Sequence, residues 1–113
     1  MLFEIRRYHF DPTLFAAYRD WAKGEALPHL SRELDIVGFW VSTDEPPQIK
    51  GEPQDRLGSA NVTWIVRWTD RAHRKLVWQK ILSDPDWKDI FSRVPGGPAS
   101  YLRMEAQLAE SIQ

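Results

Sequence analysis

Apolar and polar residues alternate along four segments of the chain, with the period of two that is typical of β-strands. These segments span residues 2–9, 36–43, 61–69 and 100–108. The third has the clearest pattern, because every second residue is apolar and large: Val62, Trp64, Val66 and Trp68. The alternation therefore predicts four strands separated by longer connections.

Apolar residues recur at helical spacing in the connection between the first and second segments. Residues 12–23 form an amphipathic helix that starts after Asp11, and Gly24 and Pro28 predict a kink before a further helical stretch to about residue 34.

A second helical pattern follows the third strand. Asp70 can cap this helix, and we expect an inward stripe made of Leu76, Val77, Ile81 and Leu82. Asp84 and Pro85 then start another helical turn. Its buried side is predicted to hold Trp87, Ile90 and Phe91.

Residues 44–60 contain three prolines and two glycines, with Ile49 and Leu57 as the only sizeable apolar side chains. Such a stretch predicts a long proline-rich hairpin loop. Two interpretations stay open, a mobile arm without chemistry and a lid over a substrate.

The order of elements is β-α-β-β-α-β, which predicts one α+β domain over residues 1–113. The simplest assembly is ferredoxin-like, a four-stranded antiparallel sheet with both helices on one face. Apolar residues lie on both sides of the second strand, with Ile36 and Trp40 on one side and Phe39 on the other, and Ile65 adds to the third. A sheet that is apolar on both faces needs two covers, so we predict a homodimer.

Composition narrows the class of protein further. The chain of 113 residues has a formal net charge of -1, which argues against a nucleic-acid partner. It has no cysteine, no apolar run long enough to span a membrane, and no pattern of a signal peptide. We therefore expect a cytoplasmic protein.

Four short motifs resemble segments of the NIPSNAP family, and they occur in order along nearly the whole chain. They are Glu4-Ile5-Arg6-Arg7-Tyr8, Val37-Gly38-Phe39-Trp40, the stretch 68–74, and Asp84-Pro85-Asp86-Trp87. The resemblance implies a dimeric α+β barrel, in which two ferredoxin-like sheets face each other across a cavity. The long loop and Trp68, where the family more often has Tyr, depart from the family pattern. The family has no settled reaction, so the fold does not assign one.

The first strand carries a row of chemically active side chains. If Phe3 and Ile5 face the helices, then Glu4, Arg6 and Tyr8 point into the cavity between the sheets. A carboxylate, a guanidinium and a phenol could bind an acidic ligand or direct a proton. The alternative is structural, with Glu4 and Arg6 paired to each other or to Arg103.

Three further residues complete the expected ligand site. Trp40 is a candidate wall of the cavity, and Gly38 beside it leaves room for a ligand. Arg67 and Arg103 would make the same face basic. The three histidines lack the spacing of a metal site, and no cofactor motif occurs, so we expect neither.

Three functions compete at this point. The first is a homodimer that binds a small, apolar or weakly acidic molecule in the cavity between its sheets. The second is a cofactor-independent monooxygenase or isomerase, in which Tyr8 and Arg6 stabilise an enolate. The third is a protein-interaction scaffold that uses the proline-rich loop. We favour the first because it explains the aromatic side chains and does not need an acid–base pair.

Overall fold

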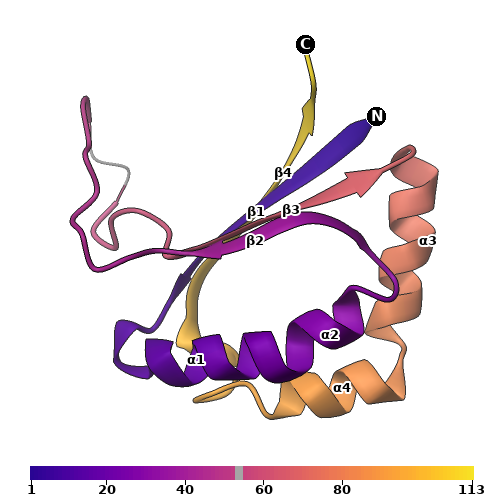
Figure 1. Ribbon diagram of the computed structural model, residues 1–113, viewed down its shortest axis with the longest axis horizontal. Coiled ribbons are helices and arrows are strands. Elements are labelled where there is room, and N and C mark those ends of the chain that lie inside the picture. The colour runs from indigo at the N-terminus through magenta and orange to yellow at the C-terminus, as the bar shows by residue number, and fades with distance from the viewer. Residues whose placement is uncertain (53–54) are drawn as a thin grey trace.

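One layer of the protein is a four-stranded antiparallel sheet, and the helices form a second layer against one of its faces (Figure 1). This description rests on a computed structural model that describes residues 1–52 and 55–113. The strand order is β2-β3-β1-β4. The strands are β1 (Leu2–Phe10), β2 (Asp35–Val41), β3 (Val62–Trp68) and β4 (Tyr101–Glu110). The predicted ferredoxin-like α+β fold is confirmed.

The helices follow the predicted order. They are α1 (Phe15–Trp21), α2 (Leu27–Leu30), α3 (Arg71–Leu82) and α4 (Pro85–Ser92), with short 3₁₀ turns at Pro12–Leu14 and Pro98–Ser100. The predicted kink between α1 and α2 is a π-helical turn, Ala22–Ala26, in which the Leu27 N–H bonds to the Ala22 carbonyl five residues earlier. Asp70 and Asp84 cap α3 and α4 as expected, because their side chains accept hydrogen bonds from the N–H groups of His73 and Asp86.

The inward stripe of α3 differs from the prediction. Leu76 and Leu82 are 67% and 63% exposed. The residues turned toward the sheet or its edge are Arg74, Val77, Trp78 and Ile81, at the spacing of one helix face. The helix is rotated this way because Arg74 and Trp78 donate hydrogen bonds to a carboxylate on β1.

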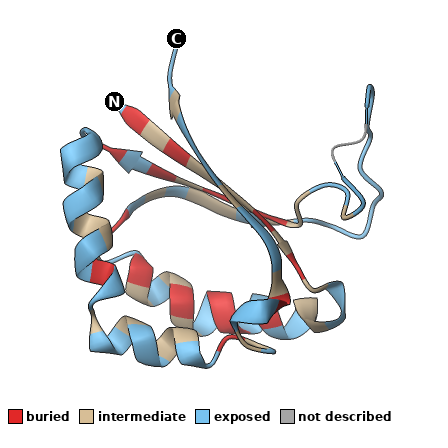
Figure 2. Ribbon diagram, turned by 180° about the vertical axis from the view of Figure 1, so that it is seen from behind, coloured by how far each residue is buried: buried red, intermediate tan, exposed pale blue. Residues whose placement is uncertain are grey.

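The two faces of β1 are opposite to the prediction. Glu4 lies opposite Val66 and Arg6 lies opposite Trp64, in the row of β3 residues that is buried under the helices. Glu4, Arg6 and Tyr8 therefore face the helices, while Phe3 and Ile5 face away. Figure 2 shows the alternation of buried and less buried positions along the central strands. Glu4 tolerates burial because side chains from β3 and α3 donate hydrogen bonds to its carboxylate.

A β-bulge explains a second difference, on β2. The register shifts between Ile36 and Gly38, so Val37 is an extra residue. Ile36 then pairs with Val66 on the helix side, whereas Trp40 pairs with Thr63 on the other face. The prediction that Ile36 and Trp40 share a face is wrong, because the strict period of two does not survive a bulge.

We call the sheet surface away from the helices the open face. It carries Phe3, Ile5, Trp40 and Ile65 in its apolar centre. The predicted loop contains no helix or strand among its described residues, and residues 53 and 54 lie outside the described part. This arm, residues 44–60, rises beside the open face (Figure 1) and is joined to β4 by an Arg103–Asp55 ion pair at 2.8 Å.

The core lies between the sheet and the helices. Its largest fully buried side chains are Trp68, Tyr18, Phe10, Ile81 and Glu4. No helix within the described ranges is long and apolar enough to cross a membrane.

Candidate functional site

Glu4 is the centre of a buried polar cluster on the helix side of the sheet, and it is completely inaccessible to solvent. Its Oε1 accepts hydrogen bonds from Trp68 Nε1 at 3.0 Å, Trp78 Nε1 at 3.0 Å and Arg74 Nε at 2.8 Å. Its Oε2 accepts from Arg6 Nη1 at 2.6 Å and from Arg74 Nη2 at 3.3 Å. Five donors thus surround one carboxylate.

These donors decide the charge state of Glu4. Burial by itself would raise the pKa of this carboxyl group, but the hydrogen bonds from Arg74, Trp78 and Arg6 outweigh that effect and lower the pKa to about 2. Glu4 is ionised at neutral pH and its oxygens are already occupied. It is therefore a fixed counter-charge for the two arginines and is poorly suited to accept a substrate proton.

Arg6 connects this buried carboxylate to the interior space beside it. Its guanidinium carbon lies 5.6 Å from the ring centroid of Tyr8, 5.7 Å from that of Trp64 and 5.1 Å from that of Trp78. Three aromatic rings therefore surround the cation, at distances at which cation–π attraction is effective. Burial acts to lower the pKa of Arg6, but Tyr8 and Glu4 outweigh it and raise the pKa. Arg6 is permanently charged.

Tyr8 and Trp64 present donors beside Arg6. The Tyr8 hydroxyl accepts a hydrogen bond from Arg6 Nε at 2.6 Å, and its own proton has no acceptor among the residues that the structure describes. Burial raises the pKa of Tyr8, which keeps the phenol protonated. The Nε1 of Trp64 is buried and makes no hydrogen bond of good geometry within the described part of the chain, although it lies close enough to the Tyr8 hydroxyl to act against the rise in the pKa of that phenol. A buried indole N–H without a partner is unusual.

A cavity of about 200 Å³ lies next to these groups, between the sheet and the helices. Apart from the polar ends of Arg6, Tyr8 and Trp64, aromatic rings make most of its wall. The rings are Tyr18, Trp21, Phe39, Trp78, Trp87, Phe91 and Tyr101, and the aliphatic members are Ala26, Leu30, Leu82 and Met104. Leu82 and Met104 are largely exposed, so the space opens between the end of α3 and strand β4.

The charges of the cluster do not balance. Arg6 and Arg74 bring two positive charges, and Glu4 is the only carboxylate that either contacts among the described residues. One positive charge is left over, and the side chain of Arg6 is only 19% exposed. Two partly buried cations that share a single carboxylate are energetically costly. The arrangement can lower this cost by binding an anion or a strong hydrogen-bond acceptor in the cavity.

The structure divides the predicted site residues between the two faces of the sheet. Glu4, Arg6 and Tyr8 come together on the helix side, and the expected pairing of Glu4 with Arg6 is found. Trp40, Arg67 and Arg103 lie on the open face, so they do not join that cluster. Arg67 pairs with Asp35 at 2.9 Å, and Arg103 pairs with Asp55. The predicted alternative of a Glu4–Arg103 pair is excluded by these positions.

The predicted space beside Gly38 is filled by the protein itself. A Cβ atom at position 38 would collide with the ring of Trp40. Glycine is needed here because the indole lies against the β2 backbone. Trp40 is 51% exposed and covers the strand without lining the cavity beside Arg6.

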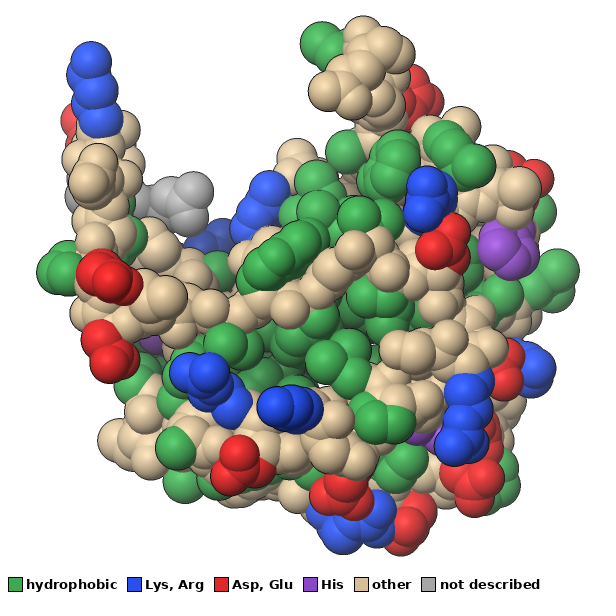
Figure 3. Space-filling view, in the orientation of Figure 1, with side chains coloured by type: hydrophobic (Ala, Val, Ile, Leu, Met, Phe, Trp, Pro, Cys, Tyr) green, Lys and Arg blue, Asp and Glu red, His purple; other side chains and the backbone are tan. Residues whose placement is uncertain are grey.

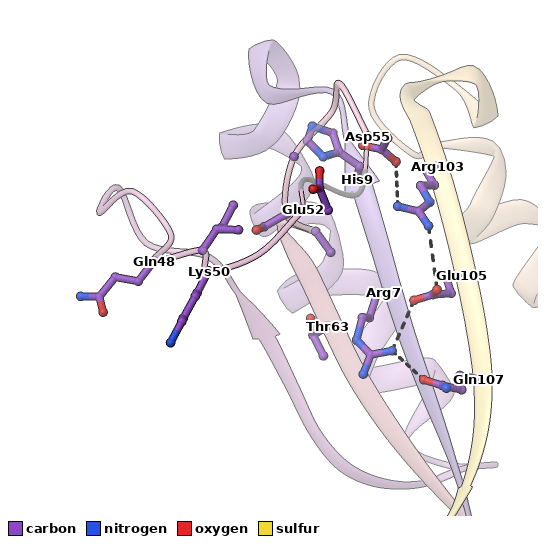
Figure 4. Close-up of a pocket in the computed structure, with 14 residues that line it drawn as sticks. Arg7, His9, Gln48, Lys50, Glu52, Asp55, Thr63, Arg103, Glu105 and Gln107 are labelled. Atoms are coloured by element: carbon purple, nitrogen blue, oxygen red, sulfur yellow. Dashed lines mark hydrogen bonds and ion pairs between the residues drawn. The ribbon is translucent and has the colours of Figure 1, made fainter.

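A second cavity, of about 770 Å³, lies between the open face and the arm (Figure 4). Its wall is largely polar, and its charges neutralise one another. Arg7 contacts Glu105 at 3.3 Å, and Arg103 contacts both Asp55 and Glu105. This cavity lacks both the aromatic lining and the excess charge of the first one, so the cavity beside Arg6 is the stronger candidate site.

Sequence reasoning missed the partners that come from other elements. Arg74 and Trp78 fall in the predicted helix after the third strand, but nothing in their spacing points to β1, and Trp64 and Trp68 fall in the apolar row of that strand. One signal was available: the β3 row that we predicted to be apolar consists partly of tryptophans, whose N–H groups need buried acceptors. No group of histidine, aspartate and glutamate side chains within the described ranges could hold a metal ion.

No known family model matches the chain, and no curated protein matches it by sequence. Solved structures do share its fold. An uncharacterized NIPSNAP domain protein from Burkholderia xenovorans superposes with a TM-score of 0.76 at 17% identity, covering 98% of this chain and 94% of that chain. A NIPSNAP family protein from Agrobacterium tumefaciens gives a TM-score of 0.76 at 14% identity, covering 96% and 90%. The predicted resemblance to NIPSNAP proteins is confirmed for the fold.

A more distant structure extends this similarity to an enzyme. The chain matches an antibiotic biosynthesis monooxygenase with a TM-score of 0.59 at 11% identity, and the alignment covers 100% of both chains. At this identity the match concerns the fold, which hosts different activities, and the residues of the site have to supply the argument for function.

Proposed function

We propose that this NIPSNAP-like protein binds a small, largely aromatic and weakly acidic molecule in the cavity between its sheet and its helices. The observation that carries this proposal is the excess positive charge of the Arg6–Glu4–Arg74 cluster, with Arg6 at the end of a space lined by aromatic rings. Apolar walls with a few convergent polar groups are typical of small-molecule sites. The location differs from the predicted cavity between two sheets, because Glu4, Arg6 and Tyr8 face the helices.

The size of the space limits the ligand. At about 200 Å³ the cavity is smaller than the roughly 300–1,000 Å³ of sites for drug-sized molecules. A ligand with one aromatic ring and a few substituents is therefore the expected class. Its ring would contact Trp78 and Phe39, and its acidic group would point toward Arg6.

Calorimetric titration with 4-nitrophenol tests this proposal. We expect saturable binding at one site per chain, weakened by at least about tenfold in Arg6→Gln because the cation is lost. Arg67→Gln is the matched control, since it removes the same side chain from the opposite face of the same sheet. Near-UV circular dichroism shows whether Arg6→Gln keeps its packing. Absence of saturable binding, or equal weakening in both variants, would refute the proposal.

A second candidate is a cofactor-independent oxygenase or isomerase, and one observation favours it. The Tyr8 hydroxyl accepts from Arg6 and keeps its own proton available toward the cavity, as a group that protonates or stabilises an enolate would. The structural similarity to a monooxygenase points in the same direction. Oxygen consumption with an activated quinol, lost in Tyr8→Phe, would support this function, whereas equal consumption in both proteins would remove Tyr8 from the reaction.

A second copy of the chain is the proposed cover of the open face. Figure 3 shows a hollow between the arm and the C-terminal end, with hydrophobic side chains on its floor. Trp40 lies on this face and is 51% exposed, and a sheet with an apolar outer face needs a cover. Native mass spectrometry of the purified chain is expected to show a dimer, and a monomer at micromolar concentration would count against it.

A further inference from the structure

We propose that the acidic group of the ligand is a single ionised oxygen, a phenolate or enolate, and that the cavity discriminates against carboxylates. This inference rests on the proposed function and specifies the ligand of the same site. It comes from the way in which the guanidinium of Arg6 is already engaged, and from the three donors that remain.

A guanidinium binds a carboxylate most strongly through two parallel N–H···O hydrogen bonds. These come either from Nε and Nη2 or from Nη1 and Nη2. In Arg6, one nitrogen of each pair already donates a hydrogen bond within the protein. Its Nε donates to the Tyr8 hydroxyl at 2.6 Å, and its Nη1 donates to Glu4 Oε2 at 2.6 Å. A carboxylate could be held by two bonds only if it displaced Tyr8 or used the second N–H of Nη1, which would place its negative charge beside that of Glu4.

Neither change is easy in this environment. Glu4 is fully buried and receives hydrogen bonds from Arg74, Trp68 and Trp78 as well. Moving Arg6 away from Glu4 would break a short charge-assisted bond inside the protein. Tyr8 is 5% exposed and its ring packs edge-on against Tyr101 at a centroid distance of 5.4 Å, so displacing it would break this packing.

The donors that remain suit one oxygen atom. Arg6 Nη2 makes no hydrogen bond among the described residues, the Tyr8 hydroxyl has a proton to donate, and Trp64 Nε1 is buried without a partner. All three residues line the same cavity. Three donors from three side chains resemble the arrangement that stabilises a developing oxyanion. A phenolate oxygen can accept all three, and its ring would occupy the aromatic part of the space.

The protonation states agree with this assignment. Burial raises the pKa of Tyr8, so the phenol stays a donor at neutral pH. The low pKa of Glu4, about 2, means that this group is an ionised carboxylate at neutral pH. It already pairs with Arg6 and Arg74. When a phenol binds in its ionised form, its O–H bond breaks, the electron pair stays on oxygen, and the proton goes to the solvent.

Three nitroaromatic probes of similar size test the inference: 4-nitrophenol, 4-nitrobenzoate and nitrobenzene. We expect 4-nitrophenol to bind at least about tenfold more tightly than 4-nitrobenzoate at about pH 7. The absorbance of bound 4-nitrophenolate reports its ionisation directly, and we expect its pKa to fall by at least about one unit on binding, which corresponds to about tenfold preference for the anion.

Two conservative variants show which groups make this preference. Trp64→Phe keeps a ring and removes the N–H, and Tyr8→Phe keeps a ring and removes the hydroxyl. We expect both to retain saturable binding of nitrobenzene and to lose most of the change in the pKa of bound 4-nitrophenol. Retention of nitrobenzene binding also shows that the cavity has kept its shape.

The outcomes separate the two proposals. If none of the probes binds, the proposed function fails. If the probes bind but 4-nitrobenzoate is held as tightly as 4-nitrophenol, or the phenol binds with an unchanged pKa, the cavity is a small-molecule site and the oxyanion inference is refuted. An unchanged pKa effect in both variants would equally refute the assignment of the donors.

Discussion

Replacement of Glu4 by glutamine is expected to destabilise the protein by about 3 kcal/mol at neutral pH. The magnitude follows from the pKa of Glu4, which the surrounding donors lower from 4.5 to about 2, because each pKa unit is worth about 1.4 kcal/mol. The side chain is fully buried, so solvent screening takes little away from this value. Glutamine fills the same space but leaves Arg6 and Arg74 without a counter-charge.

The pH dependence has a definite sign. The folded-state pKa lies below the unfolded value, so the stabilisation is complete above about pH 4.5 and is lost as the pH falls toward about 2. Urea unfolding followed by tryptophan fluorescence, at several pH values between these limits and at neutral pH, measures the free energy of unfolding. The difference between the parent and Glu4→Gln should be largest at neutral pH and shrink steadily below about pH 4.5.

A matched control is Glu110→Gln on β4, on the same face of the sheet as Glu4 but exposed to solvent. We expect this variant to change the free energy of unfolding by less than about 0.5 kcal/mol. The reasoning would be refuted if Glu4→Gln cost less than about 1 kcal/mol, or if its cost did not depend on pH.

Three further predictions concern other parts of the structure. Trp40→Ala should weaken the proposed dimer in sedimentation analysis and leave 4-nitrophenol binding unchanged, because Trp40 lies on the open face; an unchanged dimer would contradict that interface. Gly96→Ala should lower the free energy of unfolding in urea by about 1–3 kcal/mol. Gly96 has a φ of +71°, and a Cβ at this position would collide with Leu14. Gly24→Ala is the control, because a Cβ at position 24 meets no other atom and should not destabilise the protein. Asp84→Ala should cost about 1 kcal/mol, because it removes the cap of α4, and a smaller loss than about 0.3 kcal/mol would mean that the cap is dispensable.

The sequence predicts the architecture well because the architecture depends on local patterns. Alternation along β3 and the caps at Asp70 and Asp84 act within a few residues, and they are found where expected. Even the irregular turn between α1 and α2 follows from two local helix-breaking residues. These features need no knowledge of distant contacts.

The orientation of β1 could not be predicted in the same way. Phe3 and Ile5 are more apolar than Glu4 and Arg6, so a rule based on single residues turns them toward the core. The actual orientation depends on Arg74 and Trp78, which lie about 70 residues further along the chain and satisfy the carboxylate. A buried charge becomes acceptable only together with its partners, and spacing along one strand cannot reveal those partners.

The bulge in β2 limits prediction in a different way. One extra residue at Val37 turns Ile36 to the helix side, whereas Trp40 lies on the open face as the predicted cavity wall required. The isolated Gly38 is the one local sign of such a bulge. The predicted site combined residues from two faces of one sheet because the orientation of β1 was reversed. The part that faces the helices, Arg6 and Tyr8 with Glu4 behind them, remains the basis of the proposed site.

The most direct test of the proposed site is the indole N–H region of a ¹H–¹⁵N spectrum during titration with 4-nitrophenol. The chain has six tryptophans, and each gives its own signal once assigned by single Trp→Phe variants. We expect the Trp64 signal to move downfield as its unpartnered N–H gains an acceptor, while the Trp40 signal on the opposite face stays in place. Movement of Trp40 with an unchanged Trp64 would place the ligand on the open face and contradict the proposed site.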